Sequence, residues 1–292
     1  MTRIFCFPGQ GSQARGMGKD LFESFRELEQ QADEILGYSI RKLCLEDPDG
    51  NLVRTQYTQP ALYTVGVMAY RRRIDALGDT PDFVAGHSLG EYNALFAAEA
   101  FSFADGLKLV QRRGALMGEA SGGGMAAVIG ADIDSIRATL AESGETTIDV
   151  ANHNSPRQAV LAGPSDALDR VAPRFEARKG VRVIALNVRT AFHSRYMAST
   201  KAAFGAYVAG FKLGPLMLPV IANVTALPYQ DDEIAHNLVQ QTDHPVRWME
   251  SVQYLLQEPE PEFEEIGHGS VLTRLIGEVR KEAVPVNIAK RY

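Results

Sequence analysis

A serine flanked by two glycines is the part of this chain best suited to nucleophilic chemistry. The G-x-S-x-G motif at residues 86–90 follows an apolar run at 83–85 and precedes a helix-forming segment at 92–98. A turn of this kind between a strand and a helix exposes the serine hydroxyl where backbone N–H groups can stabilise an oxyanion. The motif also arises by chance in glycine-rich loops, but its strand and helix neighbours favour a nucleophile elbow. We therefore predict Ser88 as the nucleophile.

A serine nucleophile needs a base within hydrogen-bond reach, and the chain has six histidines. His87 adjoins Ser88, but adjacent side chains on a tight turn point apart. His236 lies in a polar helical stretch. His193 is favoured because it lies between an extended segment and a helix, in the expected cleft. The alternatives that this reasoning leaves open are His153, His244 and His268.

Strand and helix patterns alternate around the serine, which favours a mainly parallel sheet covered by helices. Strands are expected at 4–7, 83–85, 219–223 and 262–266. Helices are expected at 20–36, 58–77, 92–98, 103–120, 233–241 and 247–256, with one ending near 210 and a last one through 281.

Residues 125–186 follow a different order, β-α-β-β-α-β. The expected strands are 125–129, 146–151, 158–162 and 181–186, and the expected helices are 132–143 and 165–179. That order is typical of a ferredoxin-like unit, and glycines at 122–124 provide a hinge. The predicted fold class is α/β: a large parallel-sheet, α/β-hydrolase-like domain (1–121 and 190–292) with an inserted ferredoxin-like subdomain (122–189).

Composition argues against several other classes of protein. The chain has 292 residues with a net charge of −6, which does not suit a nucleic-acid-binding surface. Its two cysteines, Cys6 and Cys44, suggest neither a disulfide framework nor a zinc site, and Cys6 lies in an apolar run typical of the core. No apolar run reaches membrane length. We expect a cytoplasmic protein that binds no metal, nucleic acid or membrane.

Seven motifs, in order from residue 4 to about 280, resemble the malonyl-CoA:acyl carrier protein transacylase family. They are FPGQGSQ at 7–13, GHSLGE at 86–91, QRRG at 111–114, AFHS at 191–194, NVT at 223–225, HPVRW at 244–248 and EIG at 265–267. Two further stretches, GYSI at 37–40 and TQPALY at 58–63, look like the free-standing acyltransferases that serve polyketide synthases in trans. One departure is Gly-His-Gly at 267–269, where the family usually has Gly-Pro-Gly.

The resemblance implies roles for the catalytic residues. Ser88 would be the nucleophile and His193 the general base, oriented by the backbone carbonyl of Gln241 rather than by a carboxylate. The backbone N–H groups of Gln10 and Leu89 would form the oxyanion hole.

It also implies roles for the residues that hold the substrate. Arg113 would bind the malonyl carboxylate, a bidentate role that suits arginine. Asn223 and His87 would belong to the pocket. Phe192 would crowd a 2-methyl group and so favour malonyl over methylmalonyl.

The function implied is ping-pong transfer of a malonyl group from malonyl-CoA, through an ester on Ser88, to the phosphopantetheine thiol of an acyl carrier protein. The implied enzyme has no bound cofactor, is a monomer and serves a polyketide synthase in trans. The alternatives are the malonyl transacylase of fatty-acid synthesis, a hydrolase that edits acylated carrier proteins, and a non-catalytic docking module. Because carrier proteins of this kind are acidic, we expect a basic surface near the cleft, with Arg71–Arg73 as the candidate.

Overall fold

Two four-stranded sheets form the framework of the computed structural model, which describes residues 1–282. The strands are β1 (Thr2–Phe7), β2 (Phe83–Gly86), β3 (Gly124–Ile129), β4 (Asp149–Ser155), β5 (Gln158–Gly163), β6 (Arg182–Ala185), β7 (Val220–Ile221) and β8 (Pro261–Glu265). The α-helices are α1 (Arg26–Leu36), α2 (Ile40–Leu45), α3 (Thr55–Leu77), α4 (Gly90–Ala97), α5 (Phe103–Glu119), α6 (Ile133–Ser143), α7 (Ser165–Glu176), α8 (Ala198–Val208), α9 (Ile234–Gln240), α10 (Trp248–Leu255) and α11 (Val271–Lys281). Residues 283–292, which fall in the predicted large domain, lie outside the described residues.

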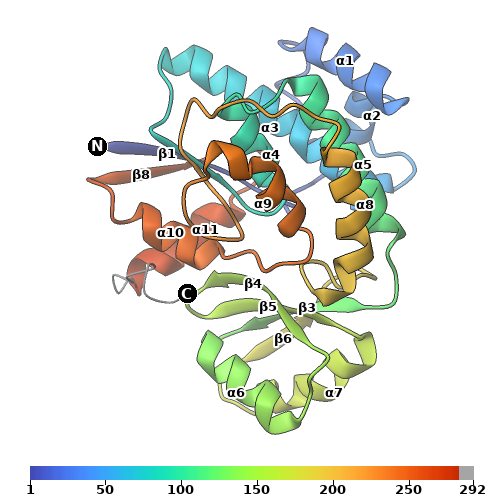
Figure 1. The fold of residues 1–292 in the computed structure, drawn as a ribbon, viewed down its shortest axis with the longest axis vertical. Helices are drawn as coiled ribbons and strands as arrows, with labels where there is room; N and C mark the ends of the chain where they lie inside the picture. The colour runs from blue at the N-terminus through green and yellow to red at the C-terminus, as the bar shows by residue number, and fades with distance from the viewer. Residues whose placement is uncertain (283–292) are drawn as a thin grey trace.

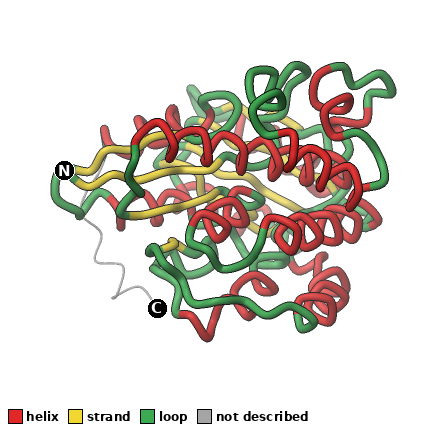
Figure 2. The backbone as a smooth tube through the Cα atoms, turned by 90° about the horizontal axis from the view of Figure 1, so that it is seen from above, coloured by secondary structure: helices red, strands yellow, loops and turns green. Residues whose placement is uncertain are grey.

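The first sheet is parallel, with strand order β7-β2-β1-β8, and helices cover both of its faces (Figures 1 and 2). Side chains alternate between the faces along β1. Phe5 and Phe7 join the core beneath α3 and α5, whereas Ile4 and Cys6 join the core beneath α10 and α11. A strand buried on both faces reads as a continuous apolar run, which is why β1 was recognisable from sequence. Cys6 is buried with a free thiol, as predicted.

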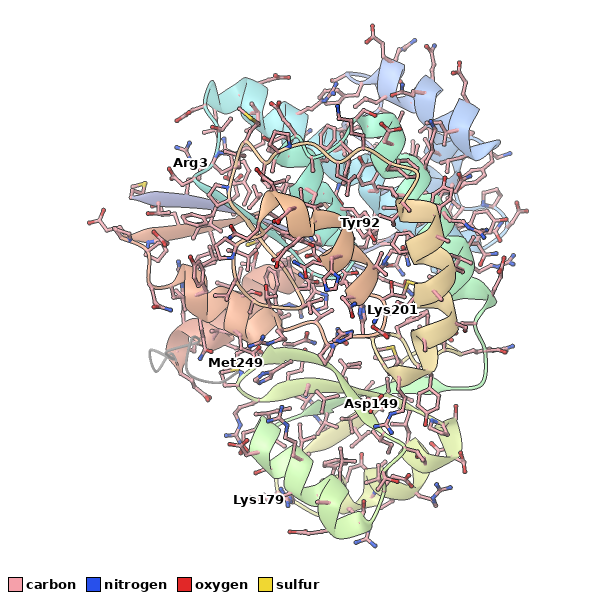
Figure 3. The ribbon with its side chains drawn as sticks, viewed as in Figure 1. Arg3, Tyr92, Asp149, Lys179, Lys201 and Met249 are labelled. Carbon is pink, nitrogen blue, oxygen red and sulfur yellow. The ribbon has the colours of Figure 1, made fainter. Side chains whose placement is uncertain are left out.

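The second sheet is antiparallel, with strand order β4-β5-β3-β6. Its helices α6 and α7 lie on the side away from the parallel sheet (Figure 1). A separate apolar cluster that includes Val128, Ile136, Leu161 and Phe175 fills the space between this sheet and its helices. In Figure 3, Tyr92 of α4 lies within the larger unit and Lys179 lies at the far end of the smaller one.

Two predicted elements begin or end more than three residues from their predicted bounds. The helix predicted from residue 20 begins at Arg26, because residues 16–24 form a chain of turns around Gly18 (φ +74°). Leu21 and Phe22 are nevertheless buried, so the apolar spacing there reflects packing of a loop. The strand predicted at 146–151 is β4, at Asp149–Ser155. The predicted strand ended too early because the polar residues 152–154 are typical of a loop, although they continue the strand.

The helix α3 is the longest in the described part of the chain and includes Pro60. No helix there is long and apolar enough to cross a membrane.

The elbow requires two glycines because three backbone segments meet there. A Cβ on Gly90 would lie 1.9 Å from the Phe7 carbonyl oxygen, and one on Gly86 would lie 2.0 Å from the Gly90 carbonyl carbon. We therefore expect Gly90→Ala to lower the free energy of unfolding by about 3 kcal/mol, through overpacking against rigid backbone.

The matched control for this prediction is Gly277→Ala in α11, where a Cβ would meet nothing within 4 Å. That variant should keep or raise stability, by up to about 1 kcal/mol, because alanine favours the helix. Urea unfolding of the three proteins checks both results. Equal stability of the two variants would contradict the close approach at the elbow.

Candidate active site

Ser88 lies at the turn between β2 and α4 and has a left-handed backbone conformation, with φ +51°. Such a conformation is strained for a residue with a side chain and persists only where the surroundings enforce it. Asn223 supplies part of that enforcement: its Oδ1 accepts from the Ser88 N–H at 2.7 Å, and its Nδ2 donates to the Gly86 carbonyl at 2.6 Å. The side chain of Asn223, just after β7, therefore stabilises the strained turn at Ser88.

His193 meets the serine from 105 residues further along the chain. Its Nε2 lies 2.8 Å from Ser88 Oγ and its Nδ1 lies 2.8 Å from the Gln241 carbonyl oxygen. A carbonyl only accepts, so Nδ1 carries the proton and Nε2 is free to accept from the serine hydroxyl. The backbone carbonyl of Gln241 thus occupies the position that a carboxylate has in a Ser-His-Asp triad.

The imidazole of His193 is held neutral. Burial, together with the positive charge of Arg113, lowers the pKa of His193 from 6.5 to about 3. A neutral imidazole beside a serine hydroxyl can take up its proton at pH 7. The three histidines that remained open from sequence lie elsewhere. His153 Nδ1 lies 3.2 Å from Glu250 Oε1, and His244 Nδ1 lies 2.5 Å from Asp243 Oδ1. His268 lies in the turn between β8 and α11.

Arg113 on α5 reaches the same serine. Its side chain is 1% exposed, and its Nη2 donates to Ser88 Oγ at 3.1 Å and to Gln241 Oε1 at 2.7 Å. Its Nη1 donates to Gln59 Oε1 at 2.8 Å. Within residues 1–282 no carboxylate contacts this guanidinium. A buried cation without an ion pair is costly, so the site is suited to a ligand that brings its own carboxylate.

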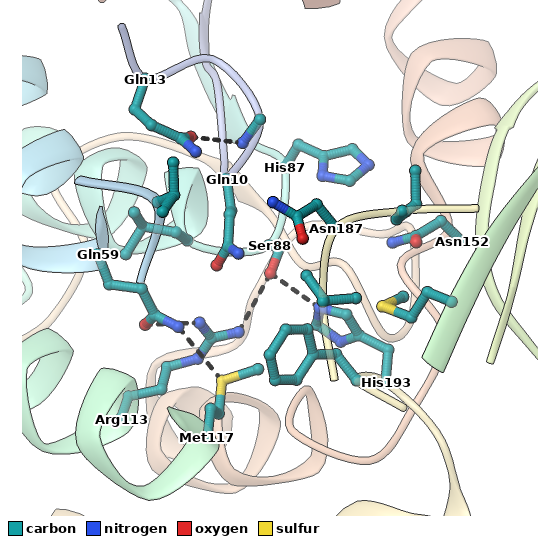
Figure 4. Close-up of a pocket in the computed structure, with 17 residues that line it drawn as sticks. Gln10, Gln13, Gln59, His87, Ser88, Arg113, Met117, Asn152, Asn187 and His193 are labelled. Carbon is teal, nitrogen blue, oxygen red and sulfur yellow. Dashed lines mark hydrogen bonds between the residues drawn. The ribbon is translucent and has the colours of Figure 1, made fainter. Parts of the chain in front are cut away.

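These groups face a cavity of about 380 Å³, drawn in Figure 4 with Ser88 between Arg113 and His193. Gln10 and Leu89 also line it, and in the described part of the chain neither of their backbone N–H groups has an internal acceptor. Two free N–H groups beside a serine hydroxyl can receive a developing oxyanion.

The remaining predicted pocket residues divide into two groups. Phe192 and His87 line the cavity, and His87 Nε2 lies 2.8 Å from Asn154 Oδ1. Asn223 and Gln241 lie behind the lining, where they hold the elbow, the arginine and the histidine. Groups of three or more His, Cys, Asp or Glu side chains placed to hold a metal ion are absent from residues 1–282.

The sequence profile described as acyl transferase domain matches residues 4–290. The chain belongs to the acyl transferase domain family. This confirms the family resemblance that the seven motifs carried.

Relatives of this acyl transferase domain include proteins named for polyketide biosynthesis. It is 50% identical over 280 residues to the polyketide biosynthesis malonyl CoA-acyl carrier protein transacylase PksC of Bacillus subtilis (strain 168), covering 96% of this chain and 97% of PksC. It is also 50% identical over 283 residues to the polyketide biosynthesis protein PksE of the same strain, covering 97% of this chain but 37% of PksE.

Solved structures share the arrangement of one parallel and one antiparallel sheet. The structure of malonyl CoA-acyl carrier protein transacylase from Burkholderia pseudomallei matches with a TM-score of 0.95 and 47% identity, covering 97% of this chain and 99% of that one. A structure titled as a type II PKS acyl-carrier protein in complex with its malonyl-transacylase matches with a TM-score of 0.90 and 36% identity, covering 96% and 94%.

Three site residues of this acyl transferase domain were not predicted as such from sequence. Gln59 holds Arg113, and Glu91 and Tyr229 form a buried pair behind the elbow, with Tyr229 donating to Glu91 at 2.5 Å. Gln59 and Glu91 lie within the quoted TQPALY and GHSLGE stretches, so the signal was present. Their roles depend on contacts with distant segments, which a motif does not display.

The predicted location of the basic surface was wrong. Arg73 follows Gln59 by fourteen residues on α3, which places it about 20 Å along the helix from the cavity. It pairs there with Glu264, at 2.6 Å. The exposed cations of this acyl transferase domain beside the cavity are instead Arg54 and Arg189, in an adjoining hollow that shares Phe192 with it.

The depressed pKa of His193 predicts a dependence of stability on pH. The unfolded chain binds a proton here below pH 6.5, whereas the folded chain resists it until about pH 3, so this group's contribution to stability falls as the pH falls through that window. Between pH 7 and pH 5 wild type should lose about 2 kcal/mol more unfolding free energy than His193→Ala. Urea unfolding at both pH values measures it, and parallel losses would show that the folded state accepts the proton.

Proposed function

We propose that this protein transfers a malonyl group from malonyl-CoA, through an ester on Ser88, to the phosphopantetheine thiol of an acyl carrier protein. The observation that carries the proposal is Arg113, a buried cation without a contacting carboxylate in the described residues, 3.1 Å from the hydroxyl of Ser88. A malonyl group supplies the missing carboxylate on the same molecule as the reactive thioester. The names of PksC and the Burkholderia pseudomallei relative agree with this chemistry.

In the first half-reaction, His193 Nε2 takes the proton of Ser88 as Oγ attacks the thioester carbon. The oxyanion of the tetrahedral intermediate accepts hydrogen bonds from the backbone N–H groups of Gln10 and Leu89. Its collapse breaks the carbon–sulfur bond, and the CoA sulfur leaves with the proton from His193. Malonyl remains on Ser88 as an ester, with its carboxylate on Arg113.

In the second half-reaction, the thiol of the carrier protein's phosphopantetheine arm gives its proton to His193 and attacks the ester carbon. The carbon–oxygen bond breaks, and Ser88 Oγ recovers the proton from His193. The product is the malonyl thioester of the carrier protein. Phe192, on the cavity wall, is the proposed barrier to a 2-methyl group.

We propose that the enzyme supplies malonyl groups to a polyketide synthase in trans. Relatives named for polyketide biosynthesis, which are 50% identical to this chain, support this role. The malonyl CoA-acyl carrier protein transacylases of Synechocystis sp. and Bacillus subtilis, whose names lack that term, are 40% and 36% identical.

We also propose that residues 122–189 form a ferredoxin-like subdomain inserted into an α/β-hydrolase-like domain. The strand order β4-β5-β3-β6 and the separate apolar cluster of that unit support it. The strand-turn-helix at Ser88 supports the hydrolase-like comparison.

Radiolabelled malonyl-CoA tests the proposed function. The label should appear on the protein after an acid quench, be released by hydroxylamine, and move to a carrier protein that bears the phosphopantetheine arm. The matched control is the same carrier protein without the arm, which should leave the label on the enzyme. Release of label as free malonic acid faster than transfer would indicate the editing hydrolase, and failure to label would overturn the proposal.

A further inference from the structure

Glu91 lies one helical turn after the nucleophile and is fully buried. Its Oε1 accepts from Tyr229 Oη at 2.5 Å and from the Asn223 N–H at 3.0 Å, and its Oε2 accepts from Gln241 Nε2. In the described part of the chain no Lys or Arg contacts this carboxylate. A buried charge held only by neutral donors is costly, and none of the catalytic steps above uses it.

The Gln241 amide lies between this carboxylate and Arg113. Its Nε2 faces Glu91 and the Ser88 carbonyl, and its Oε1 accepts from Arg113 Nη2 at 2.7 Å. An ionised carboxylate only accepts and a guanidinium only donates. The amide therefore has one orientation that satisfies Glu91, the Ser88 carbonyl and Arg113, and Glu91 supplies the charged acceptor that favours it.

The orientation of the amide in turn determines how Arg113 is held. Two amide oxygens, from Gln241 and Gln59, accept from its terminal nitrogens, while its Nε has no hydrogen-bond partner within residues 1–282. A direct ion pair with Glu91 would offset the positive charge of Arg113. Contact through the Gln241 amide instead fixes the position of Arg113 and leaves its charge available to the substrate carboxylate.

We propose that Glu91 is a positioning residue for substrate selection, which orients the Gln241 amide so that Arg113 is held beside Ser88 with its charge available to a carboxylate-bearing acyl group. The inference rests on the proposed function. Glu91 acts through the side chain of Gln241, whereas His193 is held by the backbone carbonyl of Gln241. The backbone of Gln241 is fixed separately, because its N–H donates to the Asn237 carbonyl at the end of α9. Removing the charge of Glu91 should therefore impair the selection of malonyl and spare the base.

The ionised form of Glu91 is the one that selects the amide orientation. Burial raises the pKa of Glu91 to about 7, although Tyr229, Asn223, Gln241 and the charge of Arg113 oppose the rise. The experiment is therefore run at pH 8, where the carboxylate is ionised.

The test compares acylation of Ser88 by malonyl-CoA and by acetyl-CoA in wild type and Glu91→Gln. The new amide places a donor against Gln241 Nε2, so the Gln241 amide loses the acceptor that helps to hold its oxygen towards Arg113. We expect kcat/KM for malonyl-CoA to fall roughly 10- to 100-fold, mainly through KM, which is the loss expected for a hydrogen bond to a charged group. The value for acetyl-CoA should stay within about twofold, because that substrate has no carboxylate.

Tyr229→Phe is the matched control, since it removes one donor to the same carboxylate but leaves the carboxylate in place. Because Tyr229 helps to keep the pKa of Glu91 down, this variant is compared with wild type at pH 9 as well as at pH 8. It should leave the malonyl-to-acetyl ratio unchanged. Equal loss with both substrates in Glu91→Gln, or an unchanged malonyl-to-acetyl ratio, would overturn the proposal. Wild type that takes no malonyl label would instead contradict the proposed function.

The exchange variant Glu91→Gln/Gln241→Glu separates positioning from folding. It restores a donor and acceptor pair between the two positions but puts a carboxylate directly on Arg113. We expect the midpoint of thermal unfolding of this variant to exceed that of Glu91→Gln. Its preference for malonyl-CoA over acetyl-CoA should remain as low as in Glu91→Gln. Recovery of selection together with stability would overturn the proposal, as would failure of both variants to fold, since the role would then be structural.

Discussion

Replacing His193 with alanine should slow the acylation of Ser88 by malonyl-CoA about 10³-fold or more. The imidazole is the one base within 2.8 Å of the hydroxyl among the described residues, and a serine hydroxyl without a base is a poor nucleophile at pH 7. The fall should be in the rate of label incorporation, with little change in malonyl-CoA binding. Rapid-quench labelling measures the rate, and Ser88→Ala defines the background with no ester.

His236→Ala is the matched control for His193→Ala, because that histidine is exposed on α9 and does not line the cavity. It should react like wild type. If His193→Ala kept more than about a tenth of the wild-type rate, the contribution would fall below that expected of general-base catalysis. A different group would then have to take the serine proton.

Replacing Arg113 with alanine should lower kcat/KM for malonyl-CoA about 10²- to 10³-fold, the effect of removing one member of a buried charge pair. Acetyl-CoA acylation should fall little or rise, because the cost of the unpaired buried cation is removed. Arg113→Lys should be intermediate, since an ammonium keeps the charge but lacks the planar fork that grips a carboxylate. Parallel single-turnover measurements with the two thioesters check the change in selectivity.

The neighbouring Arg112→Ala is the control for Arg113→Ala, because Arg112 lies about 100° further around the same helix and is exposed. It should leave both substrates unaffected. Equal losses for malonyl and acetyl groups in Arg113→Ala would mean that the arginine supports the serine rather than the substrate. Together with Glu91→Gln, these variants distinguish the role proposed for Arg113, binding of the substrate carboxylate, from the role proposed for Glu91, positioning of that arginine.

Local sequence was sufficient for the elements nearest the nucleophile. The apolar run of β1, the strand before Ser88 and the helix after it are each marked by residue types within a short stretch, so their types follow from periodicity and turn chemistry. The same reasoning failed at residues 20–25, where apolar spacing came from a buried loop, and at β4, where polar residues continue a strand into the site. In both places tertiary packing outweighed local preference.

The partners of Ser88 depended on the folded chain. From residues alone, His193 was one of several candidate bases, and the role of Arg113 was predicted only from the family resemblance. The structure places His193, Arg113 and Asn223 on the serine from segments 25 to 135 residues away. The roles of Gln59 and Glu91 are likewise set by which amide or carboxylate they face across the site. Hydrogen-bond direction between distant segments has no periodicity along the chain, so only the packed sheets and helices could determine it.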